Sequence, residues 1–157
     1  MLVELEPNFY EDRSYHRPVD FGHTFSPTIE KASSWRVNHG EAVGMDMLIS
    51  TGIAVVKGLC SVEVLNRLRR LLIATKLPLI HEACQPSILM AALNAVRAHR
   101  AGDLNLVVPL EIGAADFIQD VSLEEIQFGL DLITGGHSNA GCVSRPGWDV
   151  SAMRSVA

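Results

Sequence analysis

The stretch DFGHTFSPTIEKASSWRVNHGEAV, residues 20–43, holds two histidines, each within a polar motif that contains glycine. His23 lies in Asp20-Phe21-Gly22-His23-Thr24, and His39 lies in Asn38-His39-Gly40-Glu41. On one continuous helix, the sixteen positions between them would leave the imidazoles about 160° apart. A break at residues 33–38 between two helices would let both rings converge. Imidazole pairs presented in this way are typical of sites for zinc and similar metals.

The bulk composition is that of one globular domain. The 157 residues are 48% hydrophobic, which excludes a disordered chain and allows a sizeable core. The formal charge of −5 comes without a basic cluster, so we expect neither nucleic acid nor an acidic membrane as a partner. The three cysteines lack CxxC spacing, which favours free thiols in a reducing compartment and hence a cytoplasmic location.

No membrane segment or signal peptide is expected. Acidic residues stand at the N-terminus where a signal peptide carries basic ones. The longest apolar run, residues 42–56, is interrupted by Asp46 and is shorter than the roughly 20 residues of a membrane span. This run is better interpreted as a buried helix.

Two helices are expected around the histidines. The first should begin near Phe21 or Gly22 and run to about Ala32, with Pro27 kinking it or limiting its first turn. Asn38 and Glu41 have the spacing of a capping box, which should begin a second helix that ends near Lys57. His39 would then lie in the first turn, where the helix dipole favours neutral imidazole over imidazolium.

The rest of the chain predicts a mainly α domain over residues 1–135 with a small β-hairpin, followed by a disordered tail over 136–157. Ser61 should cap an amphipathic helix that ends at Leu77-Pro78, and Pro86 should open another. The apolar stripe expected on the first of these helices consists of Val64, Leu65, Leu68, Leu71 and Leu72. Residues 104–109 and 115–118 suggest two strands joined around Gly113, and Ser122 with Glu125 suggests a capping box for a last helix.

Four carboxylates lie close to the histidines in sequence, namely Asp20, Glu30, Glu41 and Asp46. Glu41 could both complete its cap and orient His39, and Glu30 suits a structural role as well as a functional one. Asp46 is better explained by a contact between helices or domains. From chemistry alone, metal binding and an ordinary structural role for the histidines both remain open.

The residues from Arg17 to Glu30, followed by His39-Gly40-Glu41-Ala42-Val43, resemble the sugar phosphate cyclases, the superfamily that contains 3-dehydroquinate synthase. A weaker resemblance continues through residues 104–113 to the last helix. It implies the helical C-terminal domain of a two-domain enzyme whose NAD-binding N-terminal domain lies outside this sequence. It also implies that His23 and His39 bind zinc or cobalt together with a glutamate from that domain.

Two departures from dehydroquinate synthases refine the resemblance. Those enzymes have asparagine in place of Asp20 and a second histidine in place of Pro27, whose side chain can neither transfer protons nor bind phosphate. The form DFGHTFSP resembles instead the 2-epi-5-epi-valiolone synthase branch, which cyclises sedoheptulose 7-phosphate. Synthesis of 3-dehydroquinate, 2-deoxy-scyllo-inosose or demethyl-4-deoxygadusol remains an alternative, as does a non-catalytic remnant.

The resemblance also suggests which residues act on the sugar phosphate. It implies catalytic roles for Asp20 and Arg17, and binding of the substrate by Arg17, His99 and Arg100. His99 and Arg100 could equally be a solvated helix end that the dipole favours. Family members are often homodimers, although an exposed apolar surface could instead face the missing domain.

Overall fold

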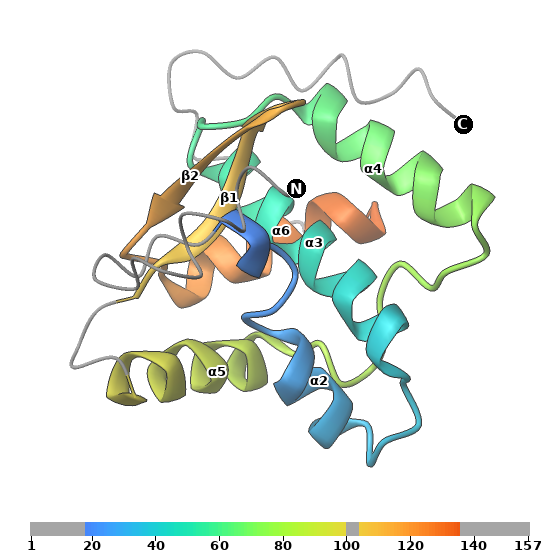
Figure 1. Cartoon of the computed structure of the whole chain (residues 1–157), viewed down its shortest axis with the longest axis vertical. Coiled ribbons are helices and arrows are strands. Elements are labelled where there is room, and N and C mark those ends of the chain that lie inside the picture. The colour runs from blue at the N-terminus through green and yellow to red at the C-terminus, as the bar shows by residue number, and fades with distance from the viewer. Residues whose placement is uncertain (1–17, 100–103, 136–157) are drawn as a thin grey trace.

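The computed structural model describes residues 18–99 and 104–135, which form a helical domain with one small β-hairpin (Figure 1). The elements are η1 (Pro18–Asp20), α2 (Ser26–Ala32), α3 (His39–Val56), α4 (Val62–Ala74), α5 (Pro86–His99), β1 (Leu106–Glu111), β2 (Ala114–Ile118) and α6 (Leu123–Thr134). The predicted fold class is therefore confirmed. The predicted tail over 136–157 lies outside the described residues.

Helix α3 is the centre of the domain. In Figure 1 it runs between the hairpin on one side and α4 on the other, and α2, α4, α6 and β1 all contact it. Every residue from Leu48 to Val55 is buried, which explains why the sequence of this helix shows no polar face. The expected buried helix is confirmed. Within the described part of the chain, no helix combines the length and apolar character needed to cross a membrane.

Helices α3 and α6 approach each other through two glycines. A Cβ atom on Gly52 would lie 2.9 Å from the carbonyl oxygen of Gly129, and one on Gly129 would lie 3.1 Å from the backbone nitrogen of Ile53. Any side chain at either position would therefore push the two backbones apart. This crossing fixes α3 against the rest of the core.

The hairpin has the position and the turn that the sequence predicts. Strands β1 and β2 pair antiparallel, with Val107 opposite Phe117, and a bulge lies between Pro109 and Glu111. Gly113 has a φ of +93° in the connecting turn, a backbone conformation that glycine adopts without steric cost. Leu106 and Val108 are buried in the core cluster.

Both predicted capping boxes are present. In α3 the Asn38 side chain accepts from the Glu41 backbone N–H, while the Glu41 carboxylate accepts from that of Asn38. Ser122 and Glu125 make the same reciprocal pair at the start of α6.

The expected start of the first helix is wrong. Helix α2 begins at Ser26, four residues later than Gly22, whose φ of +86° lies in the left-handed region. Pro27 lies in the first turn of α2, where its missing N–H leaves no helical bond unmade. It therefore starts the helix and does not kink it.

Helix α4 differs from expectation in three ways. Ser61 occupies the N-cap position, but its side chain makes no capping hydrogen bond. Leu65 and Leu72 are buried, whereas Leu71 is 57% exposed and so lies outside the expected stripe. The helix ends at Ala74, because Lys76 with a φ of +60° turns the chain away before Leu77.

Candidate metal site

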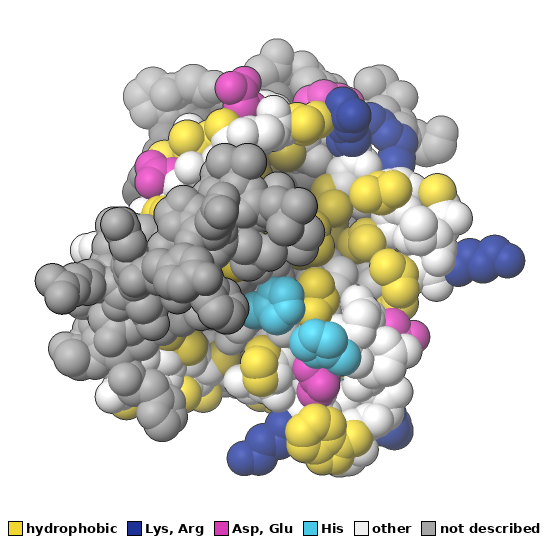
Figure 2. All heavy atoms as spheres, in the orientation of Figure 1, with side chains coloured by type: hydrophobic (Ala, Val, Ile, Leu, Met, Phe, Trp, Pro, Cys, Tyr) yellow, Lys and Arg dark blue, Asp and Glu magenta, His cyan; other side chains and the backbone are white. Residues whose placement is uncertain are grey.

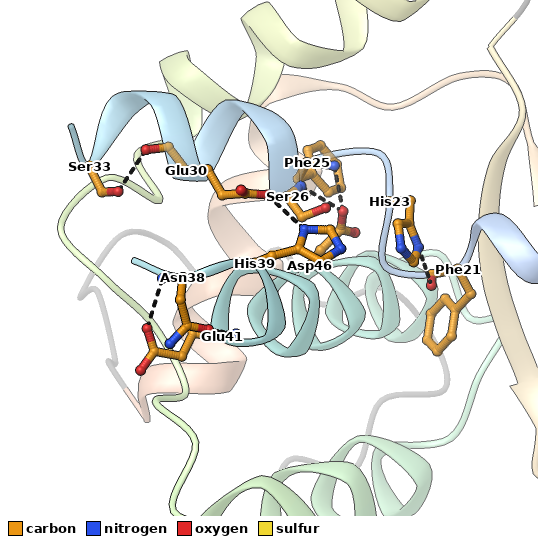
Figure 3. Close-up of polar contacts among 10 residues, drawn as sticks. All are labelled: Phe21, His23, Phe25, Ser26, Glu30, Ser33, Asn38, His39, Glu41 and Asp46. Carbon is orange, nitrogen blue, oxygen red and sulfur yellow. Dashed lines mark hydrogen bonds and ion pairs between the residues drawn. The ribbon is translucent and has the colours of Figure 1, made fainter. Parts of the chain in front are cut away.

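His23 and His39 lie side by side on an exposed face of the domain. Their ring centroids are 5.7 Å apart, with the ring planes tilted by 54°. Figure 2 shows histidine side chains gathered on this face, and Figure 3 shows the His39 imidazole between α2 and α3 and the His23 imidazole beside the loop that precedes α2. The predicted convergence is confirmed, although His23 lies in the loop before α2 and not within a helix.

Gly22 allows the His23 loop to pack closely on α3. A Cβ atom at Gly22 would lie 2.9 Å from Cγ of Met47 and 3.0 Å from Cγ1 of Val43, so only glycine allows this close approach. The His23 backbone N–H donates to the carbonyl of Asp20 at 2.9 Å, and its Nδ1 lies 3.3 Å from the carbonyl of Phe21. A proton on Nδ1 can be donated to that carbonyl, which leaves Nε2 as the nitrogen for a metal.

His39 is oriented by Glu30. Its Nδ1 lies 2.9 Å from Oε1 of Glu30 on α2, and the glutamate side chain is 15% exposed while that of histidine is 63% exposed. A carboxylate that holds Nδ1–H fixes the ring and leaves Nε2 available, as in metal sites in which a carboxylate supports a histidine ligand.

Glu41 does not orient His39, contrary to one expectation. Its carboxylate accepts from the backbone N–H of Asn38 at 3.0 Å, and in Figure 3 its side chain points away from both imidazoles. Its structural role as a cap is confirmed. The pairing of Glu30 with His39 spans nine residues and two helices, so no local spacing in the sequence indicates it.

Asp46 is fully buried beneath the loop that joins His23 to α2. Its Oδ2 accepts from the backbone N–H groups of Phe25 at 2.5 Å and Ser26 at 2.8 Å, and its Oδ1 accepts from the Ser50 hydroxyl at 3.1 Å. Burial raises the pKa of Asp46 to about 6, because desolvation of the carboxylate outweighs these hydrogen bonds. The expected contact between helices is confirmed.

The other predicted site residues are only partly described. Asp20 ends η1, three positions before His23. Arg17 and Arg100 lie outside the described residues, as does the side chain of His99, the last residue of α5. Cys60 and Cys84 are free and buried, and Cys142 is again outside the described residues.

The described residues supply two candidate ligands for a metal. No group of three or more histidine, cysteine, aspartate or glutamate side chains suited to a metal occurs within residues 18–99 and 104–135. Catalytic zinc commonly takes three protein ligands and keeps a fourth position for water or substrate. The donor set suits one edge of such a centre, because two neighbouring imidazoles each have Nδ1 beside an oxygen atom.

Comparison with known proteins assigns the chain to a family. The model of the 3-dehydroquinate synthase C-terminal family matches residues 7–97, and the chain belongs to that family. A 2-epi-5-epi-valiolone synthase from Actinoplanes sp. is 42% identical over 127 residues, which cover 81% of this chain and 32% of the relative. A 3-dehydroquinate synthase from Dictyoglomus turgidum is 32% identical over 74% of this chain and 33% of its own length.

A solved structure shares the fold. It is ValA, the 2-epi-5-epi-valiolone synthase from Streptomyces hygroscopicus subsp. jinggangensis 5008, with NAD+ and Zn2+ bound. The TM-score is 0.79 at 38% sequence identity, covering 86% of this chain and 37% of ValA. The resemblance to sugar phosphate cyclases is thus confirmed, and the chain spans about a third of the length of the curated relatives it matches.

Proposed function

We propose that this chain is the metal- and substrate-binding half of a sugar phosphate cyclase that converts sedoheptulose 7-phosphate to 2-epi-5-epi-valiolone with loss of phosphate. The observation that carries the proposal is the His23–His39 pair, at 5.7 Å, on a fold shared with an enzyme whose structure holds Zn2+ and NAD+. In this proposal His23 and His39 bind zinc, or cobalt in its place, through their Nε2 atoms.

The other predicted site residues would hold and orient the sugar phosphate. A metal at this site would polarise a hydroxyl of the substrate, and NAD would supply the hydride chemistry. Asp20, close in sequence to His23, would accept a hydrogen bond from the sugar during catalysis. Arg17 would serve both catalysis and phosphate binding, with His99 and Arg100 as further phosphate contacts, since cationic side chains match a phosphate group.

A complete centre would need a second domain. Because two ligands alone bind zinc weakly, the third ligand and the NAD site would come from an NAD-binding domain, and the chain alone would be inactive. We would combine the chain with the NAD-binding domain of a homologous valiolone synthase and supply sedoheptulose 7-phosphate, zinc and NAD+. Cyclisation should appear only in the complex. A folded, zinc-loaded complex that turns over no sugar phosphate would reject the proposal.

The proposed substrate depends on Pro27 and Asp20. Pro27 is exposed in the first turn of α2, four positions after His23, where a dehydroquinate synthase would carry a histidine. Activity of the complex on sedoheptulose 7-phosphate should exceed that on the substrates of 3-dehydroquinate and 2-deoxy-scyllo-inosose synthases. The reverse preference would keep the enzyme class but change the substrate.

A non-catalytic remnant is the second candidate. It is favoured by the lack of a three-ligand cluster within the described residues. In that case replacing both His23 and His39 with alanine should change neither the zinc content nor the melting temperature. Loss of bound zinc in the double variant would favour a retained metal site.

A further inference from the structure

We propose that Asp46 is a positioning residue for the metal site, because its one carboxylate holds both the loop that carries His23 and the helix that carries Glu30. The inference rests on the proposed function, in which His23 and His39 bind the metal. It goes further by assigning a role to a buried residue that contacts neither imidazole in any hydrogen bond or ion pair described above.

The first step is the capping of α2 by a neighbouring helix. Phe25, the N-cap residue of α2, makes no capping bond with its side chain. The backbone N–H groups of Phe25 and Ser26 donate instead to Oδ2 of Asp46, which lies on α3. An oxygen that accepts from two N–H groups at once suits a carboxylate, which carries negative charge at the positive end of the helix.

The second step links this cap to His23. Phe25 lies two residues after His23, and Gly22 lies one residue before it. Gly22 packs on Val43 and Met47 of α3, while the other end of the loop is bonded to Asp46 on the same helix. The His23 loop is therefore fastened to α3 on both sides of the histidine, as Figure 3 shows for the side that includes Asp46.

The third step links the cap to His39. Glu30 lies four residues after Ser26, about one turn further along α2, and its carboxylate bonds Nδ1 of His39. His39 is itself in the first turn of α3, the helix that carries Asp46. The distance from Glu30 to His39 thus depends on where α2 begins relative to α3, and the Asp46 cap fixes that point.

Asp46 could instead contribute to stability alone, and the two roles can be separated by looking at the imidazoles directly. We would label histidine with 15N in the whole chain and record the ring nitrogens of His23 and His39 by NMR, without metal and during titration with zinc chloride. The variants are Asp46→Ala, Asp46→Asn and Ser50→Ala. Ile133→Val, a change in the buried core on α6, serves as a control that lowers stability away from the site.

In the unchanged protein, Nδ1 of His39 should carry the proton that faces Glu30, and zinc should shift both Nε2 signals together. Asp46→Ala should erase the fixed tautomer of His39 and weaken zinc binding at least tenfold. Asp46→Asn keeps one acceptor oxygen, so its His39 tautomer and its zinc affinity should be intermediate between those of the unchanged protein and those of Asp46→Ala. Ile133→Val should lower the melting temperature and leave the tautomer and the zinc affinity unchanged.

The proposal is overturned if Asp46→Asn and Ser50→Ala fold and keep the His39 tautomer and the zinc affinity of the unchanged protein, whatever their melting temperatures. These two milder variants give the answer even if Asp46→Ala does not fold. If zinc shifts neither ring in the unchanged protein, even in large excess, the two histidines do not bind it and the proposed metal site is wrong. The positioning role of Asp46 is then still decided by the metal-free tautomer of His39.

Discussion

Glu30 Oε1 lies 2.9 Å from Nδ1 of His39, across the turn that joins α2 to α3. The glutamate side chain is mostly buried and the imidazole is mostly exposed. The carboxylate therefore fixes the ring and leaves its other nitrogen, Nε2, available to a ligand. Glu30→Gln should weaken zinc binding by roughly 10- to 100-fold, the effect of removing such a supporting carboxylate.

The matched control for Glu30 is Glu41→Gln, because glutamine can keep the capping hydrogen bond to Asn38. Zinc affinity measured by competition with a chromophoric chelator should be unchanged in this control. Equal losses in the two variants would show that a general effect of charge, and not the contact with His39, is responsible.

Removing either imidazole should abolish the zinc binding of the chain, and removing His23 should have little effect on stability. His23 is exposed, so His23→Ala should change the free energy of unfolding by less than about 0.5 kcal/mol. His39→Ala should cost more, about 1 kcal/mol, because it removes the partner of the mostly buried Glu30 carboxylate. His81→Asn is the control, since the asparagine oxygen can replace the Nδ1 that accepts from the backbone N–H of Ala83. Zinc content per chain, measured by atomic absorption, should fall only in the first two variants.

Gly22→Ala should both destabilise the fold and displace His23. The φ of +86° costs an alanine about 1–2 kcal/mol, and the new methyl group also meets Met47 and Val43. Gly58→Ala has a similar φ of +73° and open space around it, so it isolates the backbone cost. Urea denaturation should show a larger loss for Gly22→Ala. Equal losses would mean that the loop has room to lift away from α3.

Gly52→Ala should be among the most destabilising single changes in α3. Its Cβ would lie 2.9 Å from a backbone oxygen of α6, so the helices must separate, at a cost of about 1–3 kcal/mol or more. Gly44→Ala in the same helix meets only the Leu72 and Leu77 side chains at 3.4 Å or more, and should be neutral or stabilising by up to about 1 kcal/mol. Thermal unfolding of the two variants would test this contrast.

Asp46 should make the protein less stable as the pH rises. Its folded pKa of about 6 exceeds the ordinary value of 3.8, so between these two values the folded state binds more protons than the unfolded state. The free energy of unfolding should therefore fall by roughly 3 kcal/mol between about pH 4 and pH 6 from this group alone. Subtracting the curve of Asp46→Asn from that of the unchanged protein should isolate this fall, and a flat difference would contradict it.

Local spacing predicted those parts of the fold that depend on neighbours in sequence. The capping boxes of α3 and α6 each need residues three positions apart, and the turn at Gly113 needs one residue of special conformation. The start of α2 escaped prediction because its cap, Asp46, comes from another helix. The exposure of Leu71 was not predicted, because the width of the buried face of α4 depends on what packs against it.

The candidate site, too, was predicted only where it depends on local sequence. The two histidine motifs and the break between the helices predicted that His23 and His39 converge, and the structure confirms it. The support of His39 by Glu30 depends on the placement of α2 on α3, which sequence periodicity does not contain. The roles of Asp20, Arg17, His99 and Arg100 come from the family resemblance and stay predictions.

The burial of α3 from Leu48 to Val55 bears on how a metal would bind near its N-terminal end. His39 belongs to the first turn of this helix, and the His23 loop is fastened to it at Gly22 and, through Asp46, at Phe25. Both imidazoles are thus held against the central helix of the domain. The two imidazoles would therefore be close together before a metal or a second domain binds at this face. Little conformational entropy would then be lost there on binding.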